Sequence, residues 1–272
     1  MTSFRPRPVT RRVACLVSCA TLLGPVAFAE RVSAEGRRLR RADTIVSLTF
    51  DDAGADQYAA RPILAAHGMA GTFYVISGLA GRDAYYMTWD QIRDLADDGN
   101  EIGGHTLDHV KLTTVPAAEQ RRQVCDDRRN LIARGYHPTS FAYPESDVNR
   151  NAEAVVKDCG YRSGRAVGDV DCDECTTAES VPPPDPYRTR TPEPVSSSTS
   201  LAEMQGWITN AEKHGGGWIQ LVFHHICDGC SESAITARDL DLLLTWLAAR
   251  EWRGTVVKTV ADALHSDPVG PA

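Results

Sequence analysis

The stretch Thr-Ile-Val-Ser-Leu-Thr-Phe-Asp-Asp at 44–52 joins a run of apolar and β-branched residues to two adjacent carboxylates. Such a run predicts a short buried β-strand over 45–50. In folds built on parallel strands, functional residues gather where the strands end. Asp51 and Asp52 therefore stand where a site is expected, although a solvated turn or a helix cap before Gly54 would also suit them.

Outward from this strand, strand-like and helix-like segments alternate along the sequence. We predict further strands at 71–76, 101–104, 140–143, 161–166, 218–224 and 255–258. We predict helices at 58–67, 88–98, 117–134, 152–158, 200–214, 235–251 and 260–264. This alternation indicates an α/β fold with a parallel sheet, either open or closed into a barrel. Residues 167–199 contain six prolines and break the rhythm, and a connection this long usually serves a function.

The first 29 residues have the pattern of a secretory signal peptide. A basic start precedes a mostly apolar run over 13–26 and the small-x-small sequence Ala-Phe-Ala at 27–29. That run is too short to span a membrane, so we expect a secreted, cell-wall-facing protein without a stable membrane span. A twin-arginine signal and a lipoprotein box are weaker alternatives. We interpret 30–43 as a leader, 44–266 as one domain and 267–272 as a tail.

The composition argues against nucleic acid as a partner. The 272 residues have a formal net charge of −7, whereas binding to phosphates needs a basic face. Hydrophobic residues make up 42%, which is enough for a sizeable core. We expect a monomer.

Six cysteines lie beyond the signal segment, and an even number in an exported chain predicts three disulfides. They are Cys125, Cys159, Cys172, Cys175, Cys227 and Cys230. Spacing does not decide the pairing, and Cys125 with Cys159 is the single pair that we favour. Alternatively, the Cys-x-x-Cys pairs at 172/175 and 227/230 would bind zinc through four thiolates, or act as a redox module.

Two further strand ends carry histidines. His105 and His109 follow the strand predicted at 101–104, and His224 and His225 end the strand predicted at 218–224. Histidines four positions apart can share a metal ion. With one carboxylate they form a three-ligand set that leaves a position for water, as in hydrolytic zinc sites. Neighbours in a strand face opposite ways, so only one of His224 and His225 is expected to point into the site.

These motifs, in this order, resemble the polysaccharide deacetylases with NodB homology, known as carbohydrate esterase family 4. The matching segments are Thr-Phe-Asp-Asp at 49–52, His-Thr-Leu-Asp-His at 105–109 and Val-Phe-His at 222–224. Phe-Ala-Tyr-Pro at 141–144 is similar to a variant of the family's third motif. The resemblance covers roughly 44–266, which would then be the catalytic domain. It implies a distorted (β/α) barrel of seven or eight strands and one divalent metal ion, usually zinc.

The resemblance also implies roles for individual residues. Asp52, His105 and His109 would bind the metal. Asp51 would be the general base, and His224 would be the general acid. The acidic residue that orients this histidine in the family has two weak candidates here, Asp185 and Asp228.

The third motif departs from the family pattern. The arginine that steadies the catalytic base is replaced by Ala142, and Arg188 or Arg190 from the proline-rich connection would take its place. Glu145 stands where an aromatic residue is expected. Tyr143, the main chain near Glu145 and Arg190 are the candidates for holding the substrate or the oxyanion.

The resemblance implies a hydrolase that removes N-acetyl groups from a chitin-, peptidoglycan- or poly-N-acetylglucosamine-like polysaccharide by attack of metal-activated water. Hydrolysis of O-acetyl esters, as in acetylxylan, would use the same site. A carbohydrate-binding protein without catalysis is a third reading, favoured by the missing arginine and opposed by the intact metal motifs. A disulfide or zinc-thiolate module is the fourth.

Overall fold

The computed structural model describes Met1 and residues 43–265. The predicted signal peptide, nearly all of the leader, the last residue of the predicted domain and the tail lie outside the described residues, so these assignments stay predictions. Within the described part, no helix combines the length and apolar character needed to cross a membrane.

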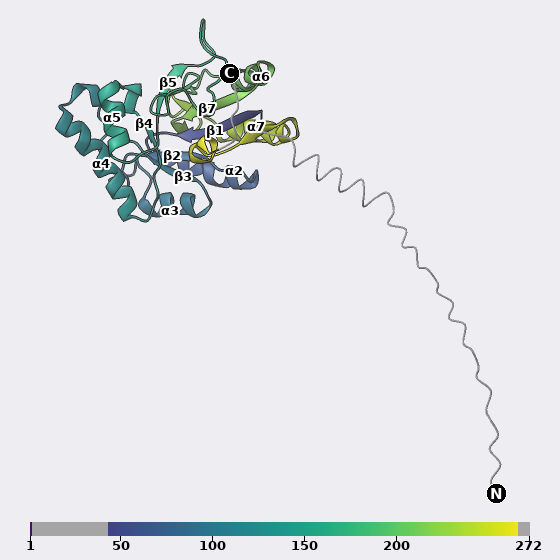
Figure 1. Cartoon of the computed structure of the whole chain (residues 1–272), viewed down its shortest axis with the longest axis horizontal. Helices are drawn as coiled ribbons and strands as arrows, with labels where there is room; N and C mark the ends of the chain where they lie inside the picture. The colour runs from purple at the N-terminus through teal and green to yellow at the C-terminus, as the bar shows by residue number, and fades with distance from the viewer. Residues whose placement is uncertain (2–42, 266–272) are drawn as a thin grey trace. The chain divides into compact units, whose positions relative to one another are not determined.

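Eight parallel strands form one sheet in which β1 (Thr44–Phe50) pairs with three others. Figure 1 shows β1 inside the described part of the chain, with helices around the sheet. The order is β10 (Thr255–Val257), β1, β2 (Thr72–Val75), β3 (Glu101–Gly104), β4 (Ser140–Ala142), β5 (Ser163–Asp169) and β6 (Thr189–Thr191), with β7 (Gly217–Phe223) also paired to β1. β1 pairs with β7 along its whole length, with β10 near its start and with β2 near its end. Every residue of β1 and β7 is buried. The expected distorted barrel is confirmed.

Helices follow the strands as the alternation predicts, with bounds within about three residues of those expected. They are α2 (Ala60–Ala66), α3 (Trp89–Asp97), α4 (Ala117–Ala133), α5 (Arg150–Asp158), α6 (Leu201–Lys213), α7 (Ala237–Ala248) and α8 (Val260–Leu264). Short 3₁₀ turns η1 (Ala55–Ala59), η2 (Leu112–Thr114), η3 (Pro144–Ser146) and η4 (Glu251–Arg253) and the small pair β8 (His225–Ile226) and β9 (Ala234–Ile235) complete the described part. Thr88 and Gln91 form the capping box that begins α3.

The proline-rich connection is more ordered than the sequence indicates. It contains β6, which is three residues long and lies between Pro186 and Pro192, so that no periodicity marks it. Glu179 pairs with Trp218 of β7 through two main-chain hydrogen bonds of 2.7 and 3.0 Å. The buried Glu179 carboxylate also binds Arg190, with Nη2 2.7 Å from Oε1. The connection therefore packs against β7 and closes this side of the barrel.

All six cysteines beyond the signal segment form disulfides. Cys125 at α4 pairs with Cys159 at the end of α5, as favoured from the sequence. The other two bonds close within each Cys-x-x-Cys pair, at 172/175 and 227/230. The four-thiolate zinc site is therefore wrong for this state, because each pair of sulfurs is bonded to itself. Among the described residues, no group of metal-binding side chains combines sulfurs from both pairs.

Glu101 links three elements of the barrel through one carboxylate. Its Oε1 accepts a hydrogen bond from Ser140 Oγ at 2.6 Å. Its Oε2 accepts from Thr72 Oγ1 and from the Ala261 N–H, both at 2.9 Å. Removal of this carboxylate from water raises the pKa of Glu101.

We expect Glu101→Gln to flatten the dependence of the unfolding free energy on pH. The native state holds the Glu101 proton more tightly than the unfolded chain does. Protonated Glu101 therefore stabilises the native state below the usual glutamate pKa, and this stabilisation is lost as pH rises through the raised native pKa. Glutamine keeps an oxygen toward Thr72 and Ala261 and donates to Ser140 Oγ. Urea unfolding from about pH 4 to pH 8 measures this. Equal slopes for both proteins would contradict it.

Glu101→Ala serves as the comparison for this variant. It leaves the Ala261 N–H without an acceptor and is expected to cost about 1–3 kcal/mol at every pH.

Candidate active site

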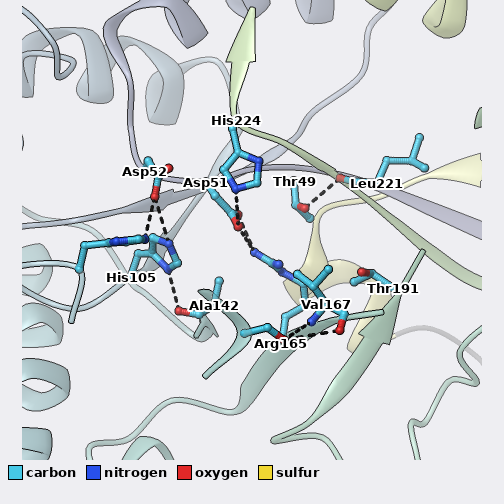
Figure 2. A network of polar contacts seen from close by, with 12 residues as sticks. Thr49, Asp51, Asp52, His105, Ala142, Arg165, Val167, Thr191, Leu221 and His224 are labelled. Carbon is cyan, nitrogen blue, oxygen red and sulfur yellow. Dashed lines mark hydrogen bonds and ion pairs between the residues drawn. The ribbon is translucent and has the colours of Figure 1, made fainter. Parts of the chain in front are cut away.

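The two carboxylates that follow β1 point in different directions (Figure 2). The N–H of Asp51 donates to the Phe223 carbonyl at 2.9 Å, which keeps Asp51 in line with β1 and β7. The chain then turns at Asp52, whose φ of 79° lies in the left-handed region. As a result Asp51 faces His224 and Arg165, while Asp52 faces His105 and His109.

Asp52, His105 and His109 converge on one point. The Nε2 atoms of His105 and His109 lie 3.3 and 3.1 Å from Asp52 Oδ1. His105 Nδ1 lies 2.7 Å from the Ala142 carbonyl oxygen, which can only accept a hydrogen bond. The proton of a neutral His105 is therefore on Nδ1, and Nε2 presents a lone pair toward Asp52. The fold brings these three residues together, as the sequence predicts.

This group fits a divalent cation. The three ligand atoms lie within 4.8 Å of one another, and Asp52 Oδ1 is buried without a hydrogen-bond donor from the part of the chain that the structure describes. Burial alone would raise the pKa of Asp52, but hydrogen bonds and positive charge from His105 and His109, when these are protonated and no metal is bound, outweigh it and hold the pKa well below its usual range. One oxygen and two nitrogens are ligands that zinc accepts, and three protein ligands leave a position open.

Asp51 is held by an arginine that the motif analysis did not single out. Arg165 lies in the middle of β5 and is 1% exposed, and Asp51 is 4% exposed. Arg165 Nη2 lies 2.5 Å from each oxygen of the Asp51 carboxylate. The guanidinium also lies 5.2 Å from the centre of the Tyr74 ring. This buried contact fixes the orientation of the Asp51 carboxylate.

The expectation that Arg188 or Arg190 replaces the missing arginine is wrong. Arg190 binds Glu179 through Nε and Nη2, at 3.0 and 2.7 Å. Arg188 lies 3.8 Å from Glu153. Both stand on the proline-rich connection, whereas Arg165 reaches Asp51 from β5. A charged residue inside a strand predicted at 161–166 was the signal in the sequence, because a buried arginine needs a partner.

His224 and His225 face opposite ways, as the strand geometry predicts. His224 Nε2 lies 4.0 Å from Asp51 Oδ2, whereas His225 Nδ1 lies 2.7 Å from Asp56 Oδ2. His224 Nδ1 is buried and receives no hydrogen-bond partner from the described residues. Neither Asp185 nor Asp228 therefore orients His224. The carboxylate of Asp185 instead accepts the N–H of Tyr187 at 2.8 Å.

The substrate candidates of the third motif lie apart from one another. Tyr143 is 1% exposed, its ring packs against Phe141, and its hydroxyl donates to the Tyr187 carbonyl at 2.9 Å. Its side chain is therefore part of the core. Glu145 is exposed and lies 2.6 Å from Lys111 Nζ. Glu145 has a φ of 51°, so the chain turns sharply there. Of the candidates in this motif, only the main chain near Glu145 fits the expected role of holding the substrate or the oxyanion.

Gln57 is a further residue of the site that the sequence did not reveal. It lies fully buried in η1, and its Nε2 donates to the main-chain carbonyls of both Asp51 and His224, the latter at 2.6 Å. One amide thus ties the end of β1 to the end of β7. A single glutamine in a turn carries no pattern from which this role could be predicted.

Comparisons with known proteins agree with this arrangement. Residues 39–164 match the family model described as polysaccharide deacetylase. "Putative polysaccharide deacetylase YxkH" of Bacillus subtilis (strain 168) is 30% identical over 122 residues, 44% of this chain and 43% of that protein. "Peptidoglycan-N-acetylmuramic acid deacetylase PdaC" of the same organism is 30% identical over 119 residues, 42% of this chain and 24% of that protein. The chain thus spans less than half the length of either relative.

A solved structure extends the likeness over most of the described fold. The crystal structure of a "putative polysaccharide deacetylase" from Mycobacterium smegmatis superposes with a TM-score of 0.63 at 17% identity. The match covers 83% of this chain and 90% of that one, which shows a shared fold. Together with the motifs at 49–52 and 105–109, these findings show that residues 39–164 are similar to polysaccharide deacetylases and that the described chain shares the fold of a solved protein of that name.

Proposed function

We propose that this protein is an exported, zinc-dependent hydrolase that removes N-acetyl groups from a cell-wall-type polysaccharide. The observation that carries the proposal is the pairing of two arrangements at the strand ends. Asp52, His105 and His109 offer three converging ligands, and Asp51 is held beside them by Arg165 within 4.0 Å of His224. The name of PdaC states that it deacetylates N-acetylmuramic acid of peptidoglycan, which supports a glycan of this class.

The residues of the site divide the work of amide hydrolysis. Asp52, His105 and His109 would hold the metal, which when bound lowers the pKa of water and polarises the acetyl carbonyl. Asp51, oriented by Arg165, accepts the proton of the attacking water. His224 donates a proton to the amine that leaves, because an amine is not expelled as an anion. A main-chain N–H of the turn near Glu145 supports the developing oxyanion.

Arg165 also bears on the alternative of a carbohydrate-binding protein without catalysis. That alternative was favoured by the absence of an arginine from the third motif. Arg165 supplies the contact to Asp51 from β5 instead, so the chemical ground for the alternative is removed. Hydrolysis of O-acetyl esters remains a second candidate, because an ester needs the same base and metal ligands.

The three disulfides favour an oxidising compartment and hence export.

A panel of acetylated glycans tests the proposal. We expect the zinc-loaded protein to release acetate from an N-acetylated glycan, a chelator to stop the release and added zinc to restore it. Chitin oligomers, peptidoglycan, poly-N-acetylglucosamine and acetylxylan form the panel. Release from acetylxylan alone would favour the ester alternative, and no release from any substrate would contradict the proposal.

Gln57→Leu is expected to lower kcat while metal content stays unchanged. The substitution leaves the carbonyls of Asp51 and His224 unpaired, at a stability cost of about 1–3 kcal/mol, and loosens the spacing of base and acid. Gln220→Leu is the matched control. Gln220 is also fully buried and donates to two acceptors, Thr189 Oγ1 and the Arg190 carbonyl, which lie away from the base and the acid.

Thermal unfolding and acetate release on both variants separate positioning from stability. Equal losses of kcat in Gln57→Leu and Gln220→Leu would contradict a positioning role for Gln57.

A further inference from the structure

A second group of metal-binding side chains lies beside His225 and shares no residue with the group around Asp52. Asp56 of η1 and the two cysteines that follow β8, Cys227 and Cys230, bring one oxygen and two sulfurs within 4.8 Å of one another. Cys230 Sγ lies 3.7 Å from Asp56 Oδ2. In the structure the two sulfurs are bonded to each other, so neither is free to bind a metal.

Asp56 is already held in the manner of a metal ligand. His225 Nδ1 lies 2.7 Å from Asp56 Oδ2, and His225 Nε2 lies 3.5 Å from the Tyr85 hydroxyl. A hydrogen bond from a second residue is the usual means of orienting a ligating side chain. Asp56 Oδ1 is buried and finds no hydrogen-bond partner within residues 43–265. The carboxylate therefore has unused lone pairs beside the sulfurs.

The loop that carries the two cysteines has supports besides the disulfide. β8 pairs with β9, and the Cys227 N–H donates to the Ile235 carbonyl at 3.0 Å. The His225 N–H donates to the Ser233 carbonyl at 3.2 Å. These bonds hold both ends of the loop, so Cys227 and Cys230 are expected to stay close together when the disulfide opens. Cys230 is exposed and accessible to a reductant.

We propose that reduction of the Cys227–Cys230 disulfide creates a second metal site, with two thiolates and the Asp56 carboxylate as ligands for a thiophilic divalent ion such as zinc. A dithiol supplies two electrons and two protons and becomes a disulfide, while Cys227 and Cys230 become thiols. Metal binding then releases the two thiol protons. Three protein ligands leave a fourth position for water or an external ligand. His225 orients Asp56.

Cobalt binding to the full chain tests this site without any measurement of catalysis. A trialkylphosphine reduces the disulfides, taking oxygen from water and adding no thiol. Cobalt is then titrated with absorption as the readout. Thiolate-to-cobalt charge-transfer absorption reports sulfur ligands, and the group around Asp52 has none. We expect this absorption in the reduced protein, from one thiolate-bound cobalt per chain in addition to any cobalt at the group around Asp52, and not in the oxidised protein.

Paired variants locate the signal. The double variant Cys227→Ser/Cys230→Ser is expected to lose the absorption. Cys172→Ser/Cys175→Ser is expected to keep it, because among the described residues that pair belongs to no group of metal ligands. Asp56→Asn, which leaves every cysteine in place, is expected to weaken cobalt binding at least about tenfold.

The proposal is overturned if the reduced Cys172→Ser/Cys175→Ser protein shows no charge-transfer absorption while circular dichroism shows it folded. It is also overturned if the absorption survives in Cys227→Ser/Cys230→Ser, or if Asp56→Asn binds cobalt as tightly as the wild type. None of these outcomes depends on whether the protein deacetylates a glycan.

Discussion

Asp51→Asn is expected to lower acetate release by about 10²–10⁴-fold, because it removes the group that takes the proton from the attacking water. Asparagine keeps an oxygen for Arg165 Nη2, so the fold should be retained. The three ligands at Asp52, His105 and His109 are untouched, and bound metal should stay at the wild-type level. Acetate release and metal content on the same sample measure both effects.

Two further variants serve as comparisons for Asp51→Asn. His224→Ala is expected to lose a similar factor with metal content intact, because it removes the proton donor of the leaving amine. His105→Ala is expected to lose the metal itself, because it removes one of three ligands. Full activity in Asp51→Asn would contradict its role as the base, whereas loss of metal in Asp51→Asn would assign it to the ligand set instead.

Arg165→Met is the second substitution expected to have a large effect, on both stability and catalysis. It leaves the Asp51 carboxylate buried without its partner, which is expected to cost about 3–5 kcal/mol of unfolding free energy. The value of kcat is also expected to fall, because the carboxylate that takes the proton from water loses the contact that orients it. Urea unfolding and kcat measure the two consequences.

The double variant Asp51→Asn/Arg165→Met separates the pair from the packing around it. When neither partner is charged, we expect part of the lost stability to return, so the two single losses should not add. Strict additivity, or an unchanged kcat in Arg165→Met, would contradict the assignment of Arg165 as the residue that holds Asp51.

The outline of the fold follows from the sequence because its strands are short, apolar and separated by helices with clear start signals. β1 and the capping box at Thr88 illustrate this. β6 was missed because three residues between prolines show no period. Its place is decided by contacts with β5 and by the Glu179–Trp218 bridge, which are distant in sequence.

The candidate site divides in the same way. The Asp-Asp and His-x-x-x-His spacings could be predicted because each motif lies within a few residues of a strand end. The contacts of Arg165 with Asp51, and of Gln57 with Asp51 and His224, could not be predicted from the sequence. They depend on how elements that are distant in sequence pack against one another. Tyr143 differs from the prediction because a residue within a motif can still pack its side chain into the core, and the motif alone does not show its direction.

Anomalous scattering at the zinc edge, from crystals of the oxidised, zinc-loaded protein, tests the metal centre most directly. We predict one strong peak at about 2.0–2.2 Å from Asp52 Oδ1, His105 Nε2 and His109 Nε2. A map without a peak there, or with zinc bound to other side chains, would contradict the assignment of these three residues as the metal ligands.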